Sequence, residues 1–256
     1  MESLREILPE VVSARVPGFL PSRSGFHFPN RFSEAPVAEL RLAGLRLPVG
    51  NASRGLCGGM VFAARDIFEA GRLPPEAATA PTRGTPLFRY LARRLFSSWG
   101  LPFGVLRYGA WSMFPDGDAW VVRGVASRTL RQEWPRVRHE VDAGRLCPLG
   151  LVRVRSISPW TMARNHQALA YGYDLDETKG LVHVLVYDPN HPDDDSIRLA
   201  FDLRAPPVHR EIGYVEGERR VRGFFVTAYM PPSSGMTSEM NSSSRTRPSD
   251  GQDTIR

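Results

Sequence analysis

Residues 50–71, GNASRGLCGGMVFAARDIFEAG, decide the fold, because they join a glycine-rich turn to the start of a helix that carries a cysteine. From Cys57 onward the apolar residues form one helical stripe with the spacing i, i+1, i+4, i+7 and i+8: Met60, Val61, Ala64, Ile67 and Phe68. Gly71 stands where a helix C-cap belongs. The pattern predicts a helix over residues 57–70 with Cys57 in its first turn.

Two more helices are expected after this one. Thr85 followed by Pro86 is an N-cap and first-turn pair, and a helical stripe of apolar residues continues from there until Gly100. A third helical stripe occupies residues 130–143. Within it, Pro135 either kinks the helix or marks the start of its second half.

Beyond residue 144 the apolar period changes from 3.6 towards 2, which is the period of a strand. Five short runs rich in Val, Leu, Phe and Tyr are expected to form antiparallel strands: residues 149–154, 167–173, 181–187, 197–203 and 221–229. Helices followed by strands are typical of an α+β architecture. We therefore expect an N-terminal helical layer, including the helix of Cys57, packed on a C-terminal antiparallel β-sheet.

The length of 256 residues is sufficient for one large domain with its own core, which we place at residues 31–230. Residues 1–30 mix Pro, Ser and Arg, and they are expected to form an extended arm that lies on the domain and is anchored by aromatic residues: Phe26, Phe28 and Phe32. Residues 231–256 are rich in Ser, Thr, Pro and Asn, and they contain few large apolar residues. This composition predicts a disordered tail.

Composition and charge also limit the partners. Lys and Arg number 33 against 27 Asp and Glu, for a net charge of +6, but Lys179 is the only lysine and the arginines are spread along the chain. A nucleic-acid footprint needs clustered cations, so we expect no nucleic-acid partner and rank an Arg-rich nucleic-acid binder last. No window has the length and hydrophobicity of a membrane span, so no membrane partner is expected. With two cysteines and no visible secretory signal, the expected location is cytoplasmic.

Three residues of the right types for thiol chemistry fall on suitable elements. The positive end of the helix dipole near Cys57 favours a thiolate, which is the nucleophilic form. His166 begins one predicted strand and Asp188 ends the next. Because neighbouring antiparallel strands place the start of one beside the end of the other, His166 and Asp188 should meet. Each residue also has a plain structural interpretation: a small buried cysteine, a solvent-facing histidine and an Asp-Pro turn residue.

The order Cys, His, Asp, together with the hairpin HQALAYGY (166–173) and LVYDP (185–189), resembles the papain-like cysteine peptidase superfamily. More narrowly, the Asp-Pro pair resembles the C39-like branch. The resemblance covers roughly residues 45–230. It implies a papain-like fold in which Cys57 is the nucleophile, His166 the general base and acid, and Asp188 the residue that orients the imidazole.

The superfamily also places a side-chain amide, usually Gln, a few residues before the nucleophile to stabilise the oxyanion. Here Asn51 stands six residues before Cys57, and its shorter side chain leaves a turn role open. Asn190 is an alternative third member of the triad, because papain-type enzymes use Asn there. The segment around Cys57 lacks the Cys-Gly-[Ser/Ala]-Cys-[Trp/Tyr] signature of papain, which makes this chain a distant relative.

The resemblance implies a thiol hydrolase, a cysteine peptidase or amidase, that acts on a peptide or amide substrate without a cofactor. No Cys/His spacing predicts a metal site. Two alternatives stay open: an acyltransferase or transglutaminase-like enzyme with the same triad, and a catalytically silent papain-like binding module. The sequence gives no indication of the oligomeric state. Residues 101–125 are the expected wall of the substrate cleft.

Overall fold

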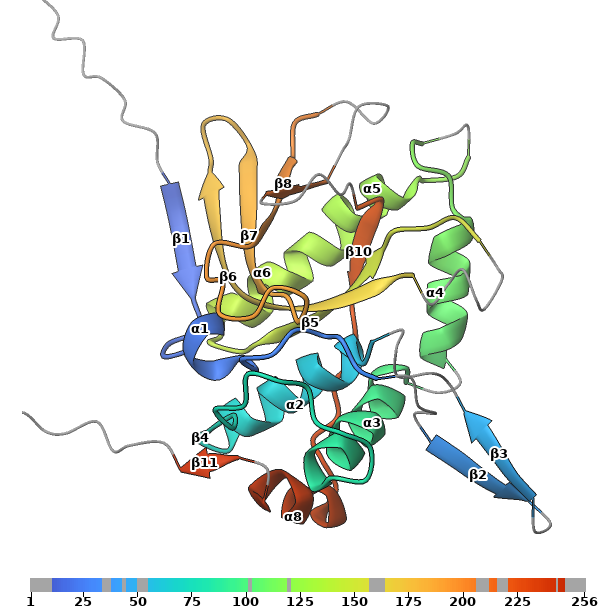
Figure 1. Ribbon diagram of the computed structural model, residues 1–256. Coiled ribbons are helices and arrows are strands. Elements are labelled where there is room, and N and C mark those ends of the chain that lie inside the picture. Colours follow the sequence, from blue (N-terminus) through green and yellow to red (C-terminus); the bar gives the residue numbers. More distant parts are fainter. Residues whose placement is uncertain are drawn as a thin grey trace, which may run out of the picture.

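A computed structural model of the chain shows an α+β fold, in which a curled antiparallel sheet packs against helices (Figure 1). The structure describes residues 11–33, 38–42, 45–49, 55–100, 103–118, 121–156, 164–205, 212–215, 221–242 and 244–246. In Figure 1 the helices α2, α3 and α8 form one layer and the sheet lies above it. No helix in these ranges is both long and apolar enough to cross a membrane.

The helical layer is built on α2 (Cys57–Glu69) and α3 (Pro86–Ser98), as their apolar stripes predict. The side chain of Thr85 caps α3, because its Oγ1 accepts a hydrogen bond from the Phe88 N–H at 3.3 Å. The two helices approach closely at Gly59, where an added Cβ would lie 2.1 Å from the carbonyl oxygen of Leu91. Only glycine permits this contact, which fixes α2 against α3 two residues after the cysteine.

The main sheet has seven strands in the order β10-β5-β6-β7-β8-β9, with β1 paired to β6, and every pairing is antiparallel. The bounds are β1 Val11–Arg15, β5 Cys147–Val152, β6 His166–Asp176, β7 Leu181–Tyr187, β8 Arg198–Asp202, β9 Gly213–Val215 and β10 Gly223–Val226. The five strands predicted from the apolar runs correspond to β5, β6, β7, β8 and β10. Strands β1 and β9 were not predicted.

The central strand β6 is buried on both faces, which explains its nearly continuous apolar sequence. Ala168 and Ala170 belong to the core formed with α6 (Trp134–Asp142), whereas Leu169 and Tyr171 belong to the core formed with α2 and α3. The sheet therefore lies between two helical groups. The first residues of β6 lie beside the start of α2, since an added Cβ at Gly58 would lie 2.8 Å from Gln167 Nε2.

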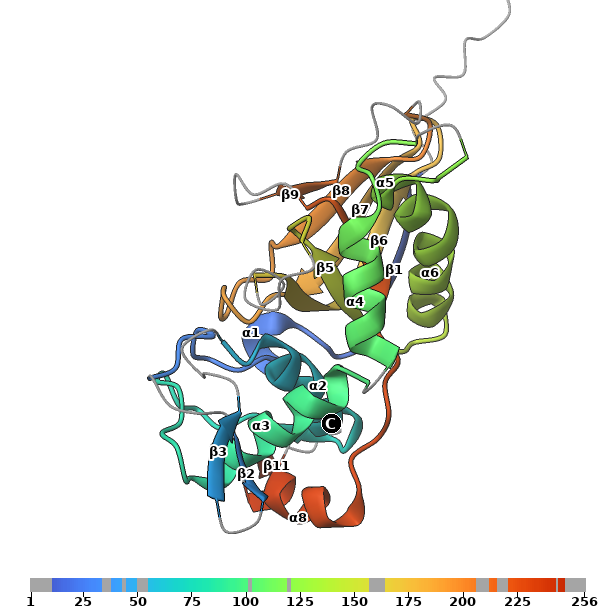
Figure 2. The ribbon, with the colours of Figure 1, turned by 90° about the vertical axis from the view of Figure 1, so that its right-hand side faces the viewer.

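The helix α6 follows α5 (Val125–Arg128) and a π-helical turn over Thr129–Glu133. Pro135 lies in the first turn of α6, so it marks the start of the second half of the predicted segment. The helix α4 (Phe103–Met113) occupies part of the expected cleft wall and packs on β5. Figure 2 shows α4 and α6 alongside the sheet.

The N-terminal arm is more regular than an extended segment. It contributes β1 to the sheet and a single helical turn, α1 (Pro21–Ser24), and the three aromatic anchors are buried: Phe26, Phe28 and Phe32. Two small sheets lie outside the main one. The first pairs β2 (Ala38–Leu42) with β3 (Leu45–Val49), and the second pairs β4 (Arg72–Leu73) with β11 (Arg245–Thr246).

The segment after residue 231 differs from the predicted disordered tail. Residues Ser234–Ser242 form helix α8, whose Met240 is only 3% exposed, and Met236 packs against the same helical core. Arg245 pairs with Glu76, which fixes β11 beside β4. Two methionines and the ion pairs of Glu239 and Arg245 thus order a stretch whose average composition is polar. The residues from 247 onward lie outside the described part of the chain.

Candidate active site

Cys57 is the first residue of α2 and is partly exposed. The preceding Gly55 has a φ of +89°, in the left-handed region that glycine adopts without strain. Gly58 is equally constrained, because an added Cβ would lie 2.2 Å from Ser98 Oγ and 2.8 Å from Gln167 Nε2. These glycines let the chain turn into the helix and bring the cysteine backbone against the sheet. The N–H groups of the first turn have no acceptor within the helix, so they favour negative charge at the sulfur.

The pairing of β6 with β7 brings His166 and Asp188 into contact. His166 is the first residue of β6 and Asp188 follows the last residue of β7, and the two strands are paired. Nε2 of His166 lies 2.6 Å from Oδ1 of Asp188, and both side chains are buried. Since Nε2 contacts the carboxylate, Nδ1 is the ring nitrogen available to Cys57.

The electrostatics of Cys57 and His166 indicate a thiolate–imidazolium pair. Burial acts to raise the pKa of the Cys57 thiol, but the charge of His166 and its hydrogen bond to the sulfur outweigh burial, and the pKa is lowered. Burial acts in the opposite direction on His166, yet the charges of Asp188 and Cys57 raise its pKa to about 9. The backbone N–H of Gln167 also donates to the sulfur and lowers the thiol pKa further. Both charged forms are thus favoured near neutral pH.

The carboxylate of Asp188 is fully buried and satisfied by three neighbours. Oδ1 contacts His166 and accepts the backbone N–H of Asn190 at 2.7 Å, while Oδ2 accepts the hydroxyl of Tyr214. Although burial acts to raise the pKa of this carboxyl, the His166 charge and these hydrogen bonds hold it well below its usual range. A fixed negative charge therefore lies behind the imidazole.

The alternative third member, Asn190, also reaches the histidine. Its Nδ2 lies 3.2 Å from His166 Nε2, which is longer than the 2.6 Å contact from Asp188. The carboxylate thus has the closer contact and supplies the charge that an amide cannot. Asn51, the predicted oxyanion residue, lies outside the described residues.

Four further residues border the site and were not among those predicted: Asn30, Tyr108, Gln167 and Tyr214. The Tyr108 hydroxyl, on α4, donates to the His166 carbonyl oxygen at 3.4 Å, and burial raises the pKa of this phenol. Gln167 Nε2 donates to Ser98 Oγ at 3.2 Å. Gln167 could have been noticed as the neighbour of His166. The other three carry no local signal, because each belongs to a segment far from the triad in sequence.

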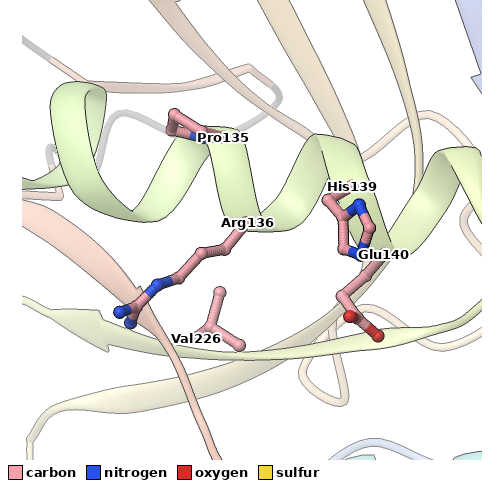
Figure 3. A pocket seen from close by; sticks show the side chains of 5 residues that line it. All are labelled: Pro135, Arg136, His139, Glu140 and Val226. Carbon is pink, nitrogen blue, oxygen red and sulfur yellow. The ribbon is translucent and has the colours of Figure 1, made fainter.

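The described ranges contain no group of three or more His, Cys, Asp and Glu side chains arranged to hold a metal ion. A separate shallow pocket lies along α6 and β10 (Figure 3), and it is lined by Pro135, Arg136, His139, Glu140 and Val226. None of the residues around Cys57 lines it. Glu140 in this pocket is already paired with Arg145, with contacts of 2.8 and 2.9 Å.

Comparison of the chain with known protein families, with curated proteins and with solved structures finds no significant match.

Proposed function

We propose that the protein is a papain-like thiol hydrolase, a cysteine peptidase or amidase with the triad Cys57, His166 and Asp188. One observation carries the proposal: a single imidazole contacts a partly exposed thiol on one side and a buried carboxylate on the other. A histidine and a cysteine that only stabilise the fold do not require this arrangement. It is the arrangement of an activated nucleophile, its base and the group that orients the base.

In the acylation step, the Cys57 thiolate attacks the carbonyl carbon of a peptide or amide, and a C–S bond forms. The carbonyl electrons move to oxygen, and the resulting oxyanion is stabilised by the N–H groups at the start of α2. As the tetrahedral intermediate collapses, the C–N bond breaks. The His166 imidazolium gives its Nδ1 proton to the departing nitrogen, which leaves as an amine.

In the deacylation step, neutral His166 takes a proton from water, and the hydroxide attacks the thioester carbon. The C–S bond then breaks, the product leaves as a carboxylic acid, and the thiolate–imidazolium pair is restored. Asp188 holds the ring with Nε2 facing its carboxylate throughout. It stabilises the imidazolium and keeps its own charge, because its pKa is held well below the usual range by the contacts described above.

The architecture supports a papain-like assignment. The nucleophile begins a buried helix of one layer, and the base and its partner come from adjacent antiparallel strands of the other. This division agrees with the family resemblance of the sequence. The helix α4 brings Tyr108 to the same site, which supports the expectation that residues 101–125 form a wall of the substrate cleft.

The test is peptide cleavage with a matched pair of cysteine variants. Wild-type protein, Cys57→Ala and Cys147→Ala are incubated with a library of internally quenched peptides, and the products are identified by mass spectrometry. Cys147 is 1% exposed in β5, and burial raises its pKa, so it serves as the control thiol. We expect cleavage by the wild type and the control variant and none by Cys57→Ala. Cleavage that survives Cys57→Ala would refute the proposal, and products joined to an added amine would assign acyl transfer instead.

A further inference from the structure

Asn30, in the N-terminal arm, lies between the two halves of the site. Its Oδ1 accepts the N–H of Leu56 at 2.6 Å, and its own backbone N–H donates to the carbonyl oxygen of Pro189 at 2.8 Å. Leu56 directly precedes the nucleophile and Pro189 directly follows Asp188. One residue therefore holds the helix that carries Cys57 and the loop that carries the carboxylate.

The side-chain amides extend this link to the imidazole. Because Asn30 Oδ1 accepts from Leu56, its Nδ2 faces the other way, and it donates to Asn190 Oδ1 at 3.3 Å. This contact fixes the Asn190 amide in turn, and its Nδ2 lies 3.2 Å from His166 Nε2, where it packs against the ring without a hydrogen bond because both nitrogens are donors. The backbone N–H of Leu56 can only donate, so it must face the oxygen of the Asn30 amide, and the Asn30 nitrogen in turn must face the oxygen of the Asn190 amide. The result is a directional series of hydrogen bonds from the residue before the thiol to Asn190, which packs against the ring of the base.

The surrounding chain is shaped to accept Asn30 at this place. An added Cβ at Gly55 would lie 2.4 Å from Asn30 Nδ2, and its φ of +89° also requires glycine. The N-cap residue Leu56 has no side-chain cap of its own, so Asn30 supplies the acceptor from another part of the chain. Two residues to either side, Phe28 and Phe32 are buried in the helical core and hold the arm in position.

We propose that Asn30 is a positioning residue of the thiol site, which sets the distance between the Cys57 sulfur and the His166 imidazole. The inference rests on the proposed function and deepens it. The thiol and the base come from different layers, so their separation depends on what joins the layers beside them. Asn30 is uncharged and contacts neither the sulfur nor the ring. It acts through Leu56, Pro189 and Asn190.

The test is the pH dependence of Cys57 alkylation by iodoacetamide, with the label located by peptide mapping. Asn30→Ala removes both side-chain contacts. The matched control is Ser22→Ala, which removes the Ser22 Oγ contact to Asp195 at 2.6 Å, a link between the same arm and the same loop that does not reach the site. Asn30→Ser, whose hydroxyl is too short to bridge both partners, is the second variant if the alanine variant does not fold. Thermal melting of each variant reports folding.

For Asn30→Ala we expect the apparent pKa of Cys57 in the pH–rate profile to rise towards that of an ordinary thiol. The labelling rate at pH 6 should then fall about tenfold for each pH unit by which the pKa rises. Ser22→Ala should keep the wild-type profile. The inference is refuted if every Asn30 variant that folds keeps the wild-type pH profile, whatever its melting temperature. It is also refuted if Ser22→Ala shifts the pH profile by the same amount. If wild-type Cys57 itself titrates as an ordinary thiol, the proposed function fails, which is a different outcome.

Discussion

Replacing Asp188 by Asn should remove the charge that keeps His166 protonated while keeping the shape of the side chain. In the wild type the pKa of His166 is raised from 6.5 to about 9, although burial acts to lower it. The Asp188 carboxylate, 2.6 Å from Nε2, is the first of the groups that overcome burial. Without its charge, only the contact with Cys57 opposes burial, so the pKa of the imidazole should fall well below about 9.

The consequence falls on the thiol. The ion pair exists between the lowered pKa of Cys57 and the raised pKa of His166, so this pH window closes when the imidazole becomes neutral. The Asp188 charge raises the thiol pKa slightly by itself, but this effect is smaller than that of His166, so losing the imidazolium dominates. Cys57 then loses the main charge that opposes burial, and only the Gln167 N–H still lowers its pKa, so the thiol should titrate near its ordinary value of 9.0. At pH 7, where such a thiol is about 1% ionised or less, alkylation should fall on the order of 100-fold from the wild-type plateau.

The assay is the second-order rate of iodoacetamide labelling of Cys57 between pH 5 and 10, in wild type and Asp188→Asn. We expect the wild type to reach its plateau below the range of a free thiol, and the variant to rise only in the alkaline range. Asp195→Asn is the control, since it removes a charge from the same loop that contacts the N-terminal arm instead of the imidazole. An unchanged profile in Asp188→Asn would refute the assignment of Asp188 as the group that charges the imidazole.

In Cys57→Ala the pKa of His166 should fall below about 9, because the thiolate charge that raises it is gone while Asp188 remains. A ¹⁵N NMR titration of the ring measures this pKa, and an unchanged value would mean that the thiol and the imidazole do not interact. Tyr214→Phe removes the hydroxyl bonded to Asp188 Oδ2 and should lower the free energy of unfolding by about 1–3 kcal/mol, measured by urea denaturation. Met240→Ala should cost about 2 kcal/mol by the same measurement, because this side chain is 3% exposed in the helical core; no loss would mean that α8 is not part of that core.

The residues that could be predicted from sequence are those with a local pattern. The apolar stripe that begins at Cys57 predicts α2. The contact between His166 and Asp188 could be predicted because their strands, β6 and β7, are consecutive and joined by a short connection. The helix over residues 103–113 could not be predicted in this way, because Gly104 and Gly109 weaken its helical propensity and packing on β5 decides the outcome.

The partners of the triad could not be predicted, because they are brought in over long sequence distances. Tyr214 belongs to a three-residue strand, β9, whose position depends on its pairing with β8. Asn30 lies 26 residues before the Leu56 N–H that it binds and 160 before the Asn190 side chain. A composition-based interpretation of residues 1–30 describes a surface arm, and nothing local marks one of its polar residues as part of the site.

The burial of Asp188 explains why the site needs these distant residues. An ionised carboxylate with no exposed surface is costly unless several donors satisfy it, and the paired strands β6 and β7 offer only His166. The hydroxyl of Tyr214 and the backbone N–H of Asn190 complete the set, so the carboxylate stays charged and Nε2 stays turned towards it. That orientation commits Nδ1 to Cys57. The reactivity of the thiol at the start of α2 therefore depends on hydrogen bonds formed on the far side of the imidazole.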